Sequence, residues 1–279
     1  MLTKVLLVSP TVWANPRANS PFACRPLVFK YMKEDKQNSS EIGKRLLTAA
    51  NNLVPYQQNG VTINYEAFPT LLDGKAKVHW LGTSATSVCV ECNSSPKLMK
   101  NRRHKKFEKC PAKNLSVGFA PCHLRQRILY WLVKGTEYRD FKNWRIRNNN
   151  KSDKKAAKRR KKEYQQEFRQ LLGIKVNETD STTKGNSNCG DTAKTCFANI
   201  SVFSKILRIY PESLIFKLKI LMEALACGRP VDPQRIREFC DTILDQFHED
   251  TNCNWNTLTP TVHFLLHHSD KVIGNSSYS

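Results

Sequence analysis

The chain has 279 residues, 40% of them hydrophobic, which is enough to bury the core of one large domain or two small ones. It carries 45 Lys and Arg against 24 Asp and Glu, so its net charge is +21, and this balance favours a polyanionic partner. No stretch approaches 18 apolar residues, and the N-terminus lacks the apolar run of a signal peptide. We predict an intracellular protein that binds DNA, without a membrane or a small-molecule substrate as partner; a homodimer is compatible with the sequence.

The first part of the chain predicts a mixed α/β region. Strands are expected at Lys4–Val8 and Leu27–Tyr31, a helix over Glu34–Leu53, and a strand over Gly60–Leu72. That last strand ends at Asp73, which is followed by Gly74. A carboxylate in this place suits metal binding or catalysis, but Asp-Gly is also an ordinary hairpin turn, and the turn is the stronger interpretation of these two residues alone.

Cys89 and Cys92 have the Cys-x-x-Cys spacing with which a tight turn presents two thiolates to one zinc ion. Two reduced cysteines without a ligand are the alternative. A redox pair would require a following helix in an early βαβ unit, which this sequence does not predict. The ten cysteines are irregularly spaced, and a chain of this length does not need a disulfide framework.

Two segments are strongly basic. Residues 93–117 read as a linker or a DNA-facing loop that includes Arg102 and Arg103. Eight of the twelve residues from Lys151 to Lys162 are Lys or Arg, and helix formers continue to a stop at Gly173. Such a helix can lie along phosphates, act as a nuclear localisation signal, or be simply solvated. The predicted DNA contacts in it are Lys154, Lys155, Lys158, Arg159, Arg160, Lys161 and Lys162.

The C-terminal third is the most regular part. Helices are predicted over Ser201–Ile209 and Glu212–Cys227, and Asn177–Asp191 before them reads as a loop. Asp232-Pro233 and Thr259-Pro260 each combine an N-cap residue with a first-turn proline. Apolar residues recur at helical spacing after the first of these caps and predict a core-facing stripe of Ile236, Phe239, Cys240, Ile243, Leu244 and Phe247. The final helix carries three histidines, His263, His267 and His268, which offer the second half of a metal site for Cys89 and Cys92.

Seven segments in order resemble the RNase H-like DDE recombinases of the Transib transposase type, which include the catalytic subunit of the V(D)J recombination-activating complex. CRPL at Cys24–Leu27 is similar to the family's CRPI, LLDGKA at Leu71–Ala76 to the strand that carries its second catalytic aspartate, and Cys89-x-x-Cys92 follows at the family's spacing. GFAPCH at Gly118–His123 resembles GLSPLH, and FRQLLG at Phe168–Gly173 resembles FRKQLG. GNSNCGDTAKTCF at Gly185–Phe197 resembles NDGNTARRFF, and TPTVHFLLHHSDKVI at Thr259–Ile273 resembles the histidine segment of the family's zinc site.

The resemblance implies roles for individual residues. Asp73 would be the second catalytic aspartate, and Cys89, Cys92, His263 and His268 would bind a structural zinc ion. The family spaces its histidines five apart, which selects His268, whereas His267 lies better on the face of His263 in an ideal helix, so the second nitrogen ligand stays open between them.

The resemblance also implies what this chain lacks. DDE chemistry uses three carboxylates to hold two Mg²⁺ or Mn²⁺ ions at one phosphodiester. The first aspartate would precede Met1 and the glutamate would follow Ser279, so we expect a truncated, inactive relative that binds Mg²⁺ or Mn²⁺ only if a complete acidic triad is assembled.

The resulting expectation is a partial RNase H-like α/β core over residues 1–92, a basic linker over 93–117, and a helical insertion with the zinc-binding region over 118–279. The predicted function is that of a nuclear, DNA-binding remnant of a recombinase. Two alternatives remain: an active strand-transferase completed by another chain or exon, and a zinc-stapled interaction domain with no role on DNA.

Overall fold

A computed structural model describes residues 36–63, 87–99, 121–141, 150–178, 188–227, 231–250 and 258–275. These residues are mostly helical, with one small sheet. Within them, nine helices and two strands have the following bounds: α1 Lys36–Asn51, β1 Tyr56–Gln58, β2 Val61–Ile63, α3 Pro96–Met99, α5 Pro121–Glu137, α6 Lys151–Leu172, α7 Gly190–Ala198, α8 Ile200–Leu207, α9 Glu212–Ala226, α10 Pro233–Asp250 and α11 Pro260–Asn275. None of the helices described is long and apolar enough to cross a membrane.

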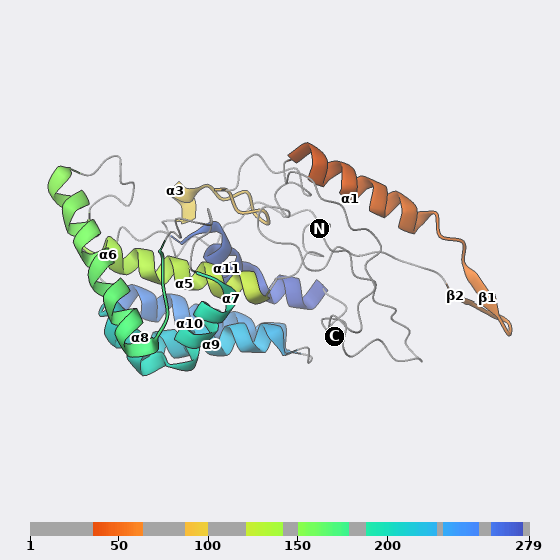
Figure 1. Cartoon of the computed structure of the whole chain (residues 1–279). Coiled ribbons are helices and arrows are strands. Elements are labelled where there is room, and N and C mark those ends of the chain that lie inside the picture. The colour runs from red at the N-terminus through yellow and green to blue at the C-terminus, as the bar shows by residue number, and fades with distance from the viewer. Residues whose placement is uncertain are drawn as a thin grey trace.

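Helices α5 to α11 form a bundle around α5, which runs through its middle (Figure 1). Trp131 on α5 lies at the centre of an aromatic group, with ring centroids 4.9 Å from Phe247 on α10 and 6.2 Å from Tyr210 before α9. The helices are amphipathic, and their apolar stripes meet in one continuous core. Among the residues that the structure describes, this core is built from helices and the segments that join them.

Capping residues set where the helices begin. The Asp232 side chain accepts a hydrogen bond from the amide of Gln234 at 2.8 Å, and Thr259 Oγ1 accepts one from the amide of Val262 at 3.4 Å. The two helices that follow, α10 and α11, pack side by side: Cys240 Sγ lies 3.4 Å from Ser269 Oγ. The two predicted caps are therefore confirmed, and so is the core stripe of α10, whose apolar residues are buried or packed against the core.

Helix α6 closes one end of the bundle, and its N-terminal half extends beyond the other helices in Figure 1. Asn150 caps its first turn, and Gly173, with φ of 66°, ends it in the left-handed conformation. Only Ala157, Tyr164 and Phe168 of this helix are buried. The prediction that the basic block continues as one helix up to Gly173 is confirmed.

The N-terminal elements are less packed. Helix α1 agrees with the predicted helix, and β1 pairs antiparallel with β2 in a hairpin in which Gln58 lies opposite Val61. Asn59 and Gly60 have φ of 51° and 79°, the positive values that a tight two-residue turn of this kind requires. The predicted strand over Gly60–Leu72 is thus corrected at its start: Gly60 belongs to the turn, and the strand described begins at Val61.

Other predictions agree with the structure only in part. Gly190 and Asp191, predicted as loop, begin α7, because Cys189 caps a short helix whose apolar residues enter the core. The fold is α/β only in the coarse sense of many helices and one two-stranded sheet among the described residues. The RNase H-like core was predicted on residues 1–92, and 1–35 and 64–86 lie outside the described residues.

Candidate metal centre

The Cys-x-x-Cys segment folds into a closed turn. The amide of Cys89 donates to the carbonyl of Ser94 at 3.0 Å, and the amide of Asn93 donates to the carbonyl of Cys89 at 3.0 Å. Asn93 has φ of 54°, a conformation that asparagine tolerates better than most residues. The turn therefore brings both thiols to one side of the segment.

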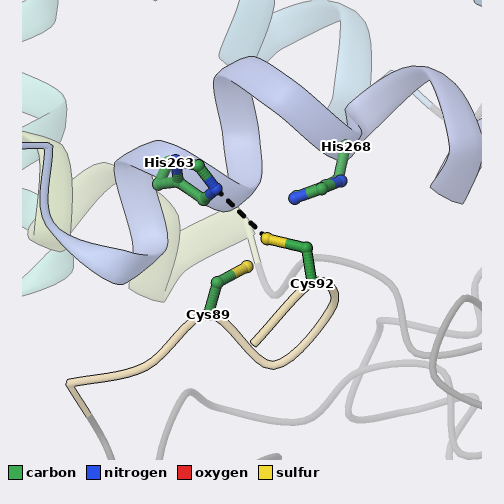
Figure 2. A group of neighbouring side chains, drawn as sticks. All are labelled: Cys89, Cys92, His263 and His268. Atoms are coloured by element: carbon green, nitrogen blue, oxygen red, sulfur yellow. Dashed lines mark hydrogen bonds between the residues drawn. The ribbon is translucent and has the colours of Figure 1, made fainter. Parts of the chain in front are cut away.

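Helix α11 supplies two imidazoles to the same place. Figure 2 shows His263 and His268 reaching from α11 toward the two cysteines. Cys92 Sγ lies 3.4 Å from His263 Nε2, although 171 positions separate these residues in the chain. One ligand atom from each of Cys89, Cys92, His263 and His268 can be chosen so that all lie within 4.8 Å of one another.

The four side chains are suited to a metal ion. With metal–sulfur and metal–nitrogen bonds of about 2.3 and 2.0 Å, a tetrahedral site separates sulfur from nitrogen by about 3.5 Å. The observed separation of 3.4 Å between Cys92 Sγ and His263 Nε2 is close to that value. All four residues are buried, so the cluster could hold a metal such as zinc in a site closed to solvent.

The thiols influence each other's proton affinity. A hydrogen bond with Cys92, followed by burial, raises the pKa of Cys89. The same hydrogen bond lowers the pKa of Cys92, with a further contribution from His263. A bound cation would hold both sulfurs as thiolates.

His267 is distinguished from the other two histidines by its surroundings. Its ring centroid lies 4.6 Å from that of His263, yet it is not part of the four-residue cluster. Burial, with the charges of His263 and Arg237, lowers the pKa of His267 to about 3. Arg237 on α10 also donates to the carbonyl of His267 at 3.1 Å. The geometry therefore groups His268, rather than His267, with the cysteines.

Apolar contacts hold the turn against α11. Met99 at the end of α3 is buried in a small cluster with Phe264 and Val272, two residues of α11, and with the two cysteines. Ser94 adds a polar contact, because Cys92 Sγ lies 3.0 Å from Ser94 Oγ. The sequence analysis did not identify Ser94, Met99 or Arg237, which contact the cluster or the histidine segment of α11. Of these, only Ser94 could have been indicated by the sequence, because it lies two positions after Cys92.

Three of the predicted DNA contacts on α6, Lys155, Lys158 and Lys162, share one face of the helix with Lys151, which was not among the predicted contacts. The four lysines recur at intervals of four, three and four residues, and all four are exposed. We call this row the lysine stripe. Lys154 and Arg159 are also exposed and Lys161 is half-buried, while Arg159 lies 3.5 Å from Glu163 in an exposed ion pair.

Arg160 points the other way. Its side chain is only 14% exposed, pairs with Asp140, and lies over the ring of Phe141 with 5.8 Å between the guanidinium carbon and the ring centroid. It also donates to the carbonyl of Glu137 at 3.4 Å. These contacts give Arg160 a role in fastening α6 to the corner after α5. Asp73, Arg102 and Arg103 lie outside the described residues.

Compared with known proteins, the chain matches no family model, and no curated protein matches it either. The function must therefore be argued from the four-residue cluster and the charged surfaces themselves.

Proposed function

We propose that this chain is a DNA-binding protein stapled by a structural zinc ion, and that it descends from the Transib-type recombinases without their cutting activity. The observation that carries the proposal is the buried cluster of Cys89, Cys92, His263 and His268, which joins a turn and a helix 171 residues apart. The resemblance of the sequence to that family supports the ancestry.

The donor set supports zinc over harder cations. Two thiolates and two imidazoles are ligands that zinc prefers, whereas Mg²⁺ and Ca²⁺ prefer oxygen. Four protein ligands leave no open position for water or substrate, which is the pattern of a structural site. In this proposal the ion fixes residues 87–99 to α11, and the chemistry of catalysis does not pass through it.

The lysine stripe supports DNA as the partner. The four lysines extend over twelve residues, so the first and last are about 16 Å apart along the helix, and successive members are about one helical turn apart. The acidic residues of α6, which are Asp153, Glu163 and Glu167, lie off this row. An uninterrupted row of positive charge attracts a phosphate backbone without reading its sequence.

Catalysis would need more than Asp73. A two-metal phosphoryl-transfer site needs three carboxylates, and the resemblance assigns Asp73 to one of them. The alternative of an active strand-transferase predicts divalent-metal-dependent nicking that Asp73→Ala abolishes, and nicking that survives this substitution would exclude that alternative.

The first experiment measures zinc per chain by elemental analysis of the purified protein. We expect one zinc in the wild type and in His267→Gln, and none in Cys92→Ser or His268→Gln. The two histidine variants make the same chemical change at neighbouring buried positions, so they separate ligand loss from general damage. Zinc retained in His268→Gln, with circular dichroism like that of the wild type, would contradict the assignment.

The second experiment tests DNA binding with charge-matched variants. Lys155, Lys158 and Lys162 are changed together to Gln, and the control changes three exposed lysines elsewhere, Lys175, Lys194 and Lys205. We expect the stripe variant to lower duplex affinity at least tenfold more than the control, and to reduce the slope of log affinity against log salt by about 0.9 for each phosphate that is no longer neutralised. Equal reductions in both variants would indicate nonspecific attraction to a polycation and would favour the interaction-domain alternative.

A further inference from the structure

A second pair of cysteines lies where two helices begin. Cys122 is the second residue of α5, and Cys189 is the N-cap residue of α7. Both are exposed and carry free thiols, and neither belongs to the metal centre. Helices α5 and α7 pack against each other, so the two starts are neighbours in the bundle.

Gly190 shows how closely Cys122 approaches the chain beside Cys189. A Cβ atom built on Gly190 would lie 2.7 Å from Cys122 Sγ, so that a larger residue could be accommodated only if the thiol moved. Since a carbon–carbon bond is about 1.5 Å long, Cys122 Sγ is no more than about 4.2 Å from the Cα of Gly190. The Cys122 thiol therefore packs on the backbone one residue away from Cys189.

Cys189 has the surroundings of a reactive thiol. Its Sγ lies 3.2 Å from Thr192 Oγ1 at the N-terminus of α7. This hydrogen bond, together with backbone donors of the first turn, lowers the pKa of Cys189. Burial has the opposite effect elsewhere in the bundle: it raises the pKa of Cys196 to about 12 and that of Cys240 to about 11. Of Cys189, Cys196 and Cys240, only Cys189 is both exposed and has a lowered pKa.

We propose that Cys189 and Cys122 form a reversible disulfide when the protein meets a hydroperoxide. The Cys189 thiolate attacks the O–O bond, which breaks as a sulfur–oxygen bond forms, and the departing hydroxide takes a proton to become water. Cys122 then attacks the oxidised sulfur, the sulfur–oxygen bond breaks, and a second water leaves with the proton from Cys122. Two thiols are oxidised to one disulfide while one peroxide is reduced to two waters.

The link would join the start of α5 to the start of α7 without touching the core. Cys189 precedes its helix and Cys122 stands in a first turn, so the movement that brings the sulfurs together falls at two helix ends and not in the core. The pair is a candidate peroxide-sensitive site in a reducing compartment, where disulfides are transient and regulatory. It does not depend on the proposed zinc or DNA functions.

The test uses the full chain with its zinc, treated with hydrogen peroxide and mapped by mass spectrometry of non-reduced peptides. We expect a linked pair of peptides that contain Cys122 and Cys189. Its mass should be two hydrogen atoms below the sum of the two reduced peptides, and the link should disappear with dithiothreitol. In Cys122→Ser the link is absent and Cys189 is trapped by dimedone as a sulfenic acid, whereas in Cys189→Ser the Cys122 thiol stays reduced.

Cys227→Ser serves as the matched control. Cys227 is also an exposed thiol, but it lies at the C-terminal end of α9, where its Sγ faces the carbonyl of Ala224. We expect this variant to form the link as the wild type does. The proposal is overturned if peroxide leaves Cys122 and Cys189 unlinked, or if either one pairs with other cysteines as readily as with its proposed partner.

Discussion

The helical bundle and the N-terminal elements obtain their structure in different ways. In the bundle, Trp131, Tyr210 and Phe247 are nearly inaccessible and pack on one another from three segments of the chain. In the N-terminal elements, Val54 is 82% exposed and Tyr56 and Val61 are also exposed, while a tight turn at Asn59 and Gly60 sets the local structure. The bundle is thus stabilised by long-range burial, whereas the hairpin depends on local preferences, and an isolated two-stranded hairpin is only marginally stable.

Residues 87–99 lie between these extremes and offer the largest predicted effect. Their described contacts with α11 are the metal cluster and the small apolar cluster around Met99. A structural zinc ion contributes on the order of 10 kcal/mol in small zinc-binding peptides. If the cluster holds the zinc ion proposed above, a chelator should therefore release the turn at Cys89–Cys92, while the aromatic core around Trp131 persists.

Hydrogen exchange and thiol labelling measure this directly. We expect the amides of residues 87–99 to lose protection and Cys89 and Cys92 to react with iodoacetamide after chelation, with α5 and α9 still protected. Cys196, which is buried in the core, provides the internal control. Loss of protection throughout the bundle would show that the metal is needed for the whole domain and that residues 87–99 unfold together with the bundle.

A core truncation should have the next largest effect. Phe247→Ala removes a buried ring that contacts both Trp131 and Tyr210, and we expect the free energy of unfolding to fall by about 3–5 kcal/mol. Val54→Ala removes two exposed methyl groups and should change it by less than about 0.5 kcal/mol. Urea denaturation followed by circular dichroism gives both numbers, and a comparable loss in Val54→Ala would mean that Val54 contributes to cooperative packing.

This division also explains what could be predicted from the sequence. The stripe of α10 and the caps at Asp232 and Thr259 are local signals, because neighbouring residues decide them, and they agree with the structure. The turn at Asn59-Gly60 is equally local, yet the sequence analysis placed Gly60 at the start of a strand and did not predict this turn. Helix α7 was missed because Gly190 and its polar neighbours resemble a loop, and packing against α5 overrides that preference.

The metal cluster required information of another kind. Nothing local to Cys92 identifies His263, 171 positions away, as its partner. The residue types suggested that the cysteines and the C-terminal histidines form one site, and the family resemblance selected His263 and His268 among the histidines. Periodicity on an ideal helix favoured His267 over His268. The structure groups His268 with the cysteines because the turn carrying Cys89 and Cys92 approaches α11 from that side, and this approach depends on tertiary contacts such as those of Met99 and Phe264.

A smaller effect distinguishes the two faces of α6, the packed face with Arg160 and the exposed face with Lys158. Arg160 contacts Asp140, Glu137 and Phe141, so Arg160→Ala should lower the free energy of unfolding by about 1–2 kcal/mol. Lys158 is exposed, and Lys158→Ala should leave stability within about 0.5 kcal/mol while it weakens DNA binding. Thermal unfolding and a DNA-binding titration of both variants test these two expectations. A loss of stability in Lys158→Ala but not in Arg160→Ala would contradict them.

Two glycines provide the finest comparison between the regions. Gly60 in the hairpin turn has φ of 79° and Gly173 at the end of α6 has φ of 66°, and in both cases an added Cβ atom would meet nothing within 4 Å. Alanine at either position therefore brings the backbone strain of a left-handed residue, about 1 kcal/mol, without a steric clash. The difference lies in what surrounds them: Ile174, next to Gly173, packs against the core, and its amide donates to the carbonyl of Phe168 at 3.3 Å.

Because Gly173 ends a helix that unfolds with the bundle, Gly173→Ala should lower the free energy of global unfolding by about 1 kcal/mol. Gly60→Ala should leave that free energy unchanged within about 0.5 kcal/mol, because its strain is relieved when the hairpin opens by itself. Chemical denaturation reports the global value, and the NMR amide shifts of Tyr56–Ile63 report the hairpin. Equal losses of global stability in the two variants would show that the hairpin unfolds together with the bundle, and the N-terminal elements would then belong to the same cooperative unit despite their exposed side chains.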